Sequence, residues 1–203
     1  MEAMIYIFQG LMLLLLYLTV IIRATFIYFN DQINPFSIGK AKNIFNMFLE
    51  YAFITGLLVW SYEIMAIVFN YNFHIIPFNF WYNLLLDNII LKYTGMLFML
   101  VGYLIFIFSL FSFGKSWRIG IDNDKPGNLV TTGMFSITRN PLFIFLDLYF
   151  IGTALINTNL FFIFIGIIFI AGIHYQILQE EIFLQKHYGK EYAEYKKRVR
   201  RYI

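Results

Sequence analysis

Residues 141–178 read PLFIFLDLYFIGTALINTNLFFIFIGIIFIAGIHYQIL, which is two apolar runs separated by three polar residues. The runs, 141–156 and 160–178, are close to the length of about 20 residues that an α-helix needs to cross a bilayer. Asn157, Thr158 and Asn159 leave room only for a tight turn between them. The stretch therefore predicts a membrane helical hairpin, with a first helix short enough that it need not cross the whole bilayer.

The rest of the chain has the same apolar character. Of its 203 residues, 60% are hydrophobic and only 13% are charged, against about 25% charged residues in soluble proteins. A chain this short has too much surface to hide this many apolar side chains from water. A small soluble domain is therefore excluded. Apolar stretches at 4–22, 45–69 and 89–113 bring the expected number of transmembrane helices to about five. We expect one all-α, polytopic membrane domain over residues 1–203, with an interfacial or re-entrant segment at 75–86.

The basic residues indicate how the helices are oriented. With the N-terminus outside, all Lys and Arg except Lys92 fall on one side of the membrane. These are Arg23, Lys40, Lys42, Lys115, Arg118, Lys125, Arg139, Lys186, Lys190, Lys196, Lys197, Arg198, Arg200 and Arg201. Cytoplasmic loops are enriched in such residues. We therefore expect an external N-terminus and a cytoplasmic C-terminus in a bacterial cytoplasmic membrane, with the polar segments 114–140 and 179–203 on the cytoplasmic face.

The segment LVTTGMFSITRNPLF, residues 129–143, leads into the 141–156 helix. Pro141 suits the first turn of a helix, where a missing amide hydrogen does no harm. Asn140 is then expected to cap the helix through its side chain. Arg139 lies at the membrane boundary, where it either fixes the topology of the chain or takes part in a site.

Carboxylates inside the apolar stretches are costly and need a partner or a cavity. Asp147 lies seven residues after Asn140, on the same helix face, and predicts either a structural pair or the polar wall of a site. Glu50 and Glu63 pose the same question. We expect Glu63 to pair with Lys92, because both lie toward the external side.

Polar residues also gather where the last apolar stretch ends. His174 and Glu181 are seven residues apart and share a face, with Glu180 adjacent. The close His and carboxylate spacings typical of zinc sites do not occur, and the chain has no Cys, so no metal site is expected.

The tail HYGKEYAEYKKRVRRYI, residues 187–203, carries an aromatic and apolar stripe at helical spacing. The stripe consists of Tyr188, Tyr192, Tyr195, Val199 and Tyr202. We expect an amphipathic helix with a basic opposite face, lying in the lipid headgroup zone. Because the helix adjoins a membrane span, nucleic acid is not an expected partner.

Together these segments resemble the isoprenylcysteine carboxyl methyltransferase-like group, which includes phospholipid N-methyltransferases and bacterial relatives. The resemblance covers residues 114–203 and follows the order of four elements: the turn LVTTGMF, the helix start Arg139 to Phe143, the pair Glu180 and Glu181, and the aromatic and basic tail. Asn140 and Phe143 stand where the family pattern has His and Tyr. Since a side-chain amide does not take up a proton near neutral pH, no general base is expected at position 140.

The resemblance implies transfer of a methyl group from S-adenosyl-L-methionine, bound at the cytoplasmic face, to a lipophilic acceptor from the bilayer. Residues 114–203 would form the cofactor-binding core and residues 1–113 the acceptor side, with no obligate protein partner. The implied catalytic residues are Arg139 and Glu181. The implied cofactor-binding residues are Leu129, Val130, Gly133, Asn140, Pro141, Phe143, His174, Glu180, Glu181 and Tyr192. A carboxylate acceptor needs no base, whereas an amine or thiol would need His174, His187 or a Glu to remove a proton.

Two other functions stay open. An NADPH-dependent sterol-type reductase has a similar terminal segment and membrane architecture. A non-enzymatic small transporter or membrane partner would use Glu50, Glu63 and Asp147 to line a polar path.

Overall fold

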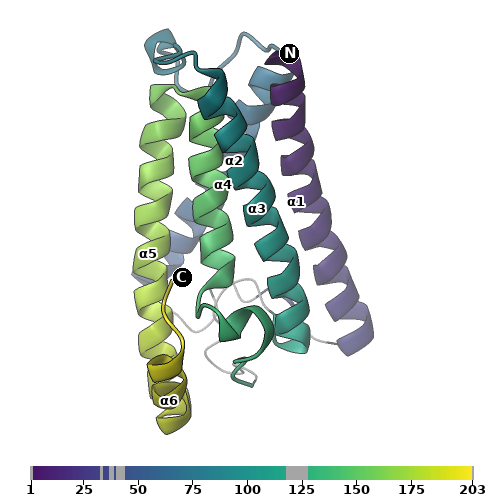
Figure 1. The fold of residues 1–203 in the computed structure, drawn as a ribbon, viewed down its shortest axis with the longest axis vertical. Coiled ribbons are helices and arrows are strands. Elements are labelled where there is room, and N and C mark those ends of the chain that lie inside the picture. Colours follow the sequence, from purple (N-terminus) through teal and green to yellow (C-terminus); the bar gives the residue numbers. More distant parts are fainter. Residues whose placement is uncertain (1, 33, 37–38, 40–43, 118–127, 203) are drawn as a thin grey trace.

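The computed structural model describes residues 2–32, 34–36, 39, 44–117 and 128–202, over which the chain forms an up-and-down helical bundle (Figure 1). Its long helices are α1 (Glu2–Asp31), α2 (Ile44–Val68), α3 (Ile89–Phe113), α4 (Pro141–Asn157) and α5 (Leu160–Tyr188), followed by the short α6 (Lys190–Arg198). We call the end of the bundle where α6 lies the α6 end; the N-terminus lies at the opposite end. Lys40, Lys42, Arg118 and Lys125, used above for orientation, lie outside the described residues.

The bundle has the surface of an integral membrane protein. Helices α1, α2, α3 and α5 are long and apolar enough to cross a bilayer. Large apolar side chains face outward along them, among them Ile44, Ile90 and Phe111, which are 87%, 71% and 77% exposed. Helix α4 has 17 residues and is therefore about 26 Å long, the shortest of the five. The expected all-α membrane fold is confirmed.

The predicted hairpin is formed by α4 and α5. Helix α4 ends at Asn157 and α5 begins at Leu160, so the turn is as short as expected. Thr158 adopts the left-handed conformation that ends α4. Asn159 then caps α5, because its side-chain oxygen accepts a hydrogen bond from the Phe162 amide at 3.0 Å.

Close backbone contact holds α3 against α4. A Cβ added at Gly95 would lie 2.5 Å from the Gly152 carbonyl oxygen, and one added at Gly152 would lie 2.6 Å from that of Gly95. Small residues at such a crossing let two membrane helices approach closely. On the other side of α4, Trp60 of α2 packs edge-on against Phe150 and Phe162, with ring centroids 5.0 and 4.8 Å away. These contacts fix α4 in the centre of the bundle.

The expected pairing of Glu63 with Lys92 is wrong. Glu63 is fully buried and accepts hydrogen bonds from the Ile75 amide at 2.8 Å and the Tyr82 hydroxyl at 3.0 Å, and it lies 2.7 Å from His74 Nδ1. Lys92 instead binds Glu2 and Asp87, at 2.7 and 2.6 Å. The reason is that residues 70–88 fold over the end of the bundle opposite α6 and supply nearer partners to both charges.

Residues 75–86, expected as an interfacial or re-entrant segment, belong to this covering loop. They contain one short 3₁₀ helix, Asn79–Trp81. The loop is tied to the α4–α5 hairpin because the Leu85 amide donates to the Thr158 carbonyl at 2.8 Å. The Thr158 hydroxyl donates in turn to the Leu86 carbonyl.

The amphipathic tail helix is shorter than expected. Helix α6 ends at Arg198, so Val199 and Tyr202 do not continue the helical stripe. The chain beyond it is extended and forms an isolated parallel bridge between Thr138 and Arg200. Tyr192 and Tyr195 are 1% and 3% exposed. The stripe therefore faces the protein, not the lipid headgroups.

Candidate active site

Three segments meet at the α6 end of the bundle: the start of α4, the last turns of α5 and the extended C-terminal segment 199–202. The Arg139 amide donates to the Arg200 carbonyl at 3.0 Å. The Thr138 hydroxyl and the Asn140 side-chain amide both donate to the Arg201 carbonyl, each at 3.0 Å. The expected cap by the Asn140 side chain is therefore wrong, because this side chain binds the tail rather than a free amide of α4.

Glu181 is held between two arginines. Arg139 Nη2 lies 2.6 Å from Glu181 Oε1, and Arg201 donates through Nε at 3.0 Å and through Nη2 at 2.8 Å. Hydrogen bonding to Glu181 raises the pKa of Arg201 above its ordinary value. Only 7% of the Arg139 and Glu181 side chains is exposed. Charge-assisted, two-point contacts of this kind are the strong class of protein hydrogen bonds.

The Arg139 side chain also holds the C-terminal tail by binding backbone carbonyls of the tail. Its Nη1 donates to the carbonyls of Lys196 and Val199, at 3.1 and 2.8 Å. The Nε of Arg139 is buried and has no hydrogen-bond partner among the described residues. Arg139 thus organises the three segments.

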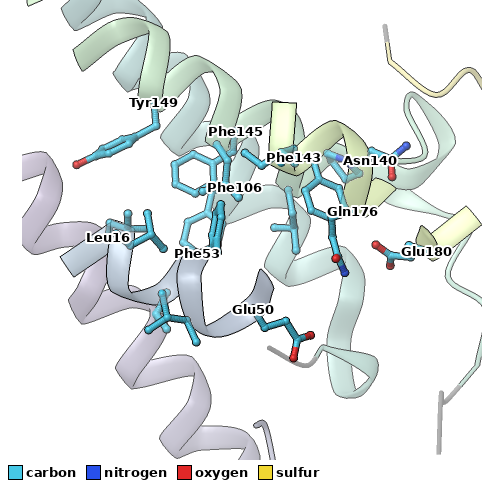
Figure 2. A pocket seen from close by; sticks show the side chains of 18 of the residues that line it. Leu16, Glu50, Phe53, Phe106, Asn140, Phe143, Phe145, Tyr149, Gln176 and Glu180 are labelled. Atoms are coloured by element: carbon cyan, nitrogen blue, oxygen red, sulfur yellow. The ribbon is translucent and has the colours of Figure 1, made fainter. Parts of the chain in front are cut away.

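A cavity of about 650 Å³ opens beside these segments and runs into the bundle between α1, α2, α4 and α5 (Figure 2). Its charged and amide-bearing lining residues are Glu50, Arg139, Asn140, Gln176 and Glu180, and hydroxyl groups are contributed by Ser61, Tyr17, Tyr149 and Tyr175. Most of the remaining wall is apolar and aromatic, including Leu13, Leu16, Val20, Phe53, Leu57, Phe106, Phe145 and Leu146. Small-molecule sites have volumes of about 300–1,000 Å³ and this same combination of an apolar wall with a few polar groups.

The two consecutive glutamates point to different places. Glu180 lines the cavity, where Figure 2 shows its carboxylate at the same end as Asn140 and Gln176. Glu181 does not line it, because its carboxylate is bound by the two arginines. Successive helical residues are about 100° apart around the axis, so neighbours cannot share one face.

An aromatic cluster closes the α6 end beside the cavity. Phe135, Tyr192, Tyr195 and Val199 are buried together, and Leu129 and Val130 pack against them. The Tyr195 hydroxyl donates to the Phe135 carbonyl at 2.6 Å. Burial raises the pKa of Tyr192 and of Tyr195 to about 12, so both phenols stay protonated near neutral pH. The cluster connects α6 to the turn that precedes α4.

The structure explains why the LVTTGMF turn contains a glycine, Gly133. It has a positive φ of 62°, and a Cβ there would collide with the Ser112 hydroxyl at the end of α3. The same hydroxyl accepts a hydrogen bond from the Met134 amide at 3.0 Å. Gly133 therefore shapes the turn that carries Phe135 to the cavity wall, at a position where another residue would be strained.

Of the residues expected at the site, five line the cavity: Arg139, Asn140, Pro141, Phe143 and Glu180. The others surround it without lining it. Leu129, Val130 and Tyr192 belong to the aromatic cluster, Gly133 to the turn and Glu181 to the ion cluster. His174 Nδ1 lies 2.8 Å from the Tyr202 hydroxyl. Asp147 lies outside the lining as well, and one of its carboxylate oxygens is buried with no partner among the described residues.

Sequence reasoning did not assign Gln176 or Glu50 to the site. Gln176 lies one turn before Glu180 on the same face of α5, a spacing that could have identified it. Glu50 was singled out as a carboxylate in an apolar stretch that needs either a structural partner or a cavity, without a role in the methyltransferase site. It lines the cavity from α2 and also accepts a hydrogen bond from the Gly39 amide at 2.9 Å.

Comparison with protein-family models matches residues 91–191 to the phospholipid methyltransferase family. Searches of curated proteins and of solved structures gave no match. The matched residues comprise almost all of α3, the turn before α4, the α4–α5 hairpin and the start of α6, and so contain Arg139, Asn140 and both glutamates. Through these residues the chain belongs to the phospholipid methyltransferase family of membrane methyltransferases.

Proposed function

We propose that the protein transfers a methyl group from S-adenosylmethionine to a lipophilic acceptor taken from the bilayer. The observation that carries the proposal is the cavity, which joins a polar end beside Arg139 and Glu180 to an apolar interior between membrane helices. A water-soluble donor and a lipid-soluble acceptor need one enclosed space that offers both environments. Because basic residues crowd the α6 end, we infer that this end is cytoplasmic.

The residues at the polar end fit the chemistry of the donor, which carries an amine, a carboxylate, ribose hydroxyls and a sulfonium. Glu180 can accept hydrogen bonds from the amine or the hydroxyls, and the positive charge of Arg139, which lines the cavity, can attract the carboxylate. Aromatic faces attract a neighbouring cation, and Phe113, Phe135 and Phe143 line this part of the cavity. When bound, S-adenosylmethionine supplies an activated methyl group.

The chain itself then has to align the reactants and exclude water. Alignment of two reactants in an enclosed site contributes a large share of the rate of a displacement reaction. Arg139 and Glu181 act as positioning residues, because they hold α4, α5 and the tail around the polar end. Glu180 is the carboxylate placed to take up a proton, should the acceptor be an amine or a thiol. Neither Asn140, an amide, nor His174, which lies outside the lining, fits that role.

The proposal can be tested by ligand stabilisation of the purified protein in detergent. S-Adenosylhomocysteine is expected to raise the unfolding temperature, because a ligand that prefers the native state stabilises it. NADPH is expected to have no effect. Stabilisation by NADPH alone would support a reductase instead, and stabilisation by neither ligand would contradict a cofactor-binding enzyme.

A variant links the result to the site. Glu180→Gln removes the negative charge at constant shape and is expected to weaken S-adenosylhomocysteine binding about 10- to 100-fold, the effect of losing a charged hydrogen bond of about 1.5–3 kcal/mol. Glu194→Gln, which removes an exposed carboxylate of α6, is the matched control and should bind as the wild type does.

A further inference from the structure

The surface of α6 that faces away from the bundle is strongly basic. Tyr192 and Tyr195 point inward, into the aromatic cluster, so the exposed positions of α6 carry its charged residues. Together with the last turn of α5 and the chain just after α6, this surface exposes six cations and two carboxylates. They are Lys186, Lys190, Lys196, Lys197, Arg198 and Arg200, with Glu191 and Glu194. We call these residues the basic face.

The positive charge of the protein is concentrated in the basic face. Six cations against two carboxylates give it a formal charge of +4, whereas the whole chain has a net charge of +3. None of its cations forms an ion pair with a carboxylate among the described residues. A cluster of like charges that its own protein does not neutralise attracts a surface of the opposite sign.

The length of α5 places the basic face at the level of the lipid headgroups. Leu160 and Ile182 are the first and last large apolar side chains that α5 exposes, at 37% and 64%. At 1.5 Å per residue they are about 33 Å apart, close to the thickness of the hydrocarbon core of about 30 Å. Helix α6 lies beside the turns that follow, at the extreme end of the bundle (Figure 1), because Leu184 and Tyr188 of α5 pack against its buried side.

A layer of anionic phospholipid headgroups fits both the charge and the depth of the basic face. Clusters of four to eight Lys and Arg on a helix at this depth are attracted to anionic lipid, with a gain of about fivefold in affinity for each basic residue. The long side chains of Lys and Arg reach phosphate groups while their methylene stems lie along apolar surface. A nucleic acid would have to displace the headgroups to reach the same residues.

The position of α6 also affects the candidate active site. Arg139, which lines the cavity, donates to the carbonyls of Lys196 and Val199 at 3.1 and 2.8 Å. The Tyr195 hydroxyl donates to the carbonyl of Phe135, another residue of the cavity lining. Detachment of α6 from the bundle would break these contacts. Headgroups that hold α6 in place therefore stabilise this part of the cavity wall.

We propose that the basic face binds anionic phospholipid headgroups, and that this binding holds α6 over the candidate active site and so raises the affinity of the site for its cofactor. The effect on cofactor affinity rests on the proposed function. The binding of lipid rests only on the charge and the depth of the basic face.

The test measures amide hydrogen exchange of α6 in the full-length protein, in nanodiscs of phosphatidylcholine alone or with 30% phosphatidylglycerol. Lys190→Gln/Lys197→Gln/Arg198→Gln removes three positive charges. The matched control, Glu191→Gln/Glu194→Gln, removes two negative charges from the same surface. Glutamine preserves helix propensity, and for each protein the exchange rates in the two lipids are compared, so that an effect of the substitution on the helix itself cancels.

In the wild type, α6 is expected to exchange at least about tenfold more slowly with phosphatidylglycerol than without it. This slowing should fall below about twofold in the triple variant or in 0.5 M NaCl, which screens charges, and should increase in the control variant. Amides of α4 serve as the internal standard and should not respond to lipid charge. Equal α6 exchange in both lipids, or equal slowing in all three proteins, would overturn the proposal. Equal slowing by 10 mM inorganic phosphate in phosphatidylcholine nanodiscs would also overturn it, because the surface would then bind a free anion.

Binding of S-adenosylhomocysteine in the same nanodiscs separates lipid binding from the proposed function. Phosphatidylglycerol is expected to increase its affinity in the wild type and not in the triple variant. If lipid slows exchange in α6 but S-adenosylhomocysteine does not bind in either lipid, the basic face binds lipid and the proposed function fails. If S-adenosylhomocysteine binds equally in both lipids while α6 exchange depends on lipid charge, the link to cofactor affinity fails and lipid binding stands.

Discussion

Arg139 Nη2 and Glu181 Oε1 lie 2.6 Å apart, with only 7% of either side chain exposed. The same guanidinium donates to the carbonyls of Lys196 and Val199. One buried ion pair therefore connects the start of α4, the end of α5 and the chain that leaves α6. This connection shapes the polar end of the cavity.

We expect Arg139→Ala to lower the free energy of unfolding by about 3–5 kcal/mol, because it leaves Glu181 buried with part of its charge uncompensated. Arg198→Ala, at an exposed position of α6, is expected to change it by no more than about 0.5 kcal/mol. Denaturant unfolding in detergent measures both. Equal losses in the two variants would contradict the role assigned to Arg139.

Substitutions of Glu180 and Glu181 are expected to have different effects, one on ligand affinity and the other on the unfolding temperature. Glu181→Gln removes the charge bound by Arg139 and Arg201, so its unfolding temperature is expected to fall. Glu180→Gln is expected to keep the unfolding temperature of the wild type and to lose affinity for S-adenosylhomocysteine. Thermal unfolding with and without the ligand measures both effects. A lower unfolding temperature in Glu180→Gln together with unchanged affinity would refute the division.

The contact between α3 and α4 predicts a strong effect from a single methyl group. Gly152→Ala places a Cβ 2.6 Å from the Gly95 carbonyl oxygen, and we expect a destabilisation of about 1–3 kcal/mol from the forced separation of the helices. Gly172→Ala is the matched control, since its Cβ meets nothing within 4 Å. It should be neutral or stabilising by up to about 1 kcal/mol through helix propensity. Stability that is unchanged in Gly152→Ala would show that the helices do not pack this closely.

The absence of Cys from the sequence allows a direct test of orientation. Glu194→Cys in α6 and Asn72→Cys in the loop at the opposite end both introduce a thiol at an exposed position. With a membrane-impermeant maleimide added to intact cells, we expect Asn72→Cys to react and Glu194→Cys to react only after lysis. The reverse pattern would invert the proposed topology and place the polar end of the cavity outside.

Much of the fold could be predicted because the bilayer restricts what apolar segments can form. A segment that crosses the bilayer core, where there is no water, must satisfy its own backbone hydrogen bonds. Long apolar runs therefore form helices. Residues 89–113 match α3 at both ends, and the three polar residues 157–159 were sufficient to predict the α4–α5 hairpin. The Glu63 pairing could not be predicted, since it depends on how residues 70–88 fold back over the bundle.

The sequence by itself determined that this is a helical membrane protein, and its motif order indicated that Arg139, Asn140 and the glutamate pair belong to one site. Only the tertiary structure decided which of two adjacent glutamates faces the cavity, that the tail leaves its helix at Arg198 to pair with Thr138, and that Glu50 and Gln176 join the lining. The reason is physical. Apolar length and helical periodicity are local properties, whereas the direction of a side chain relative to a cavity depends on how separate helices are rotated and packed against one another.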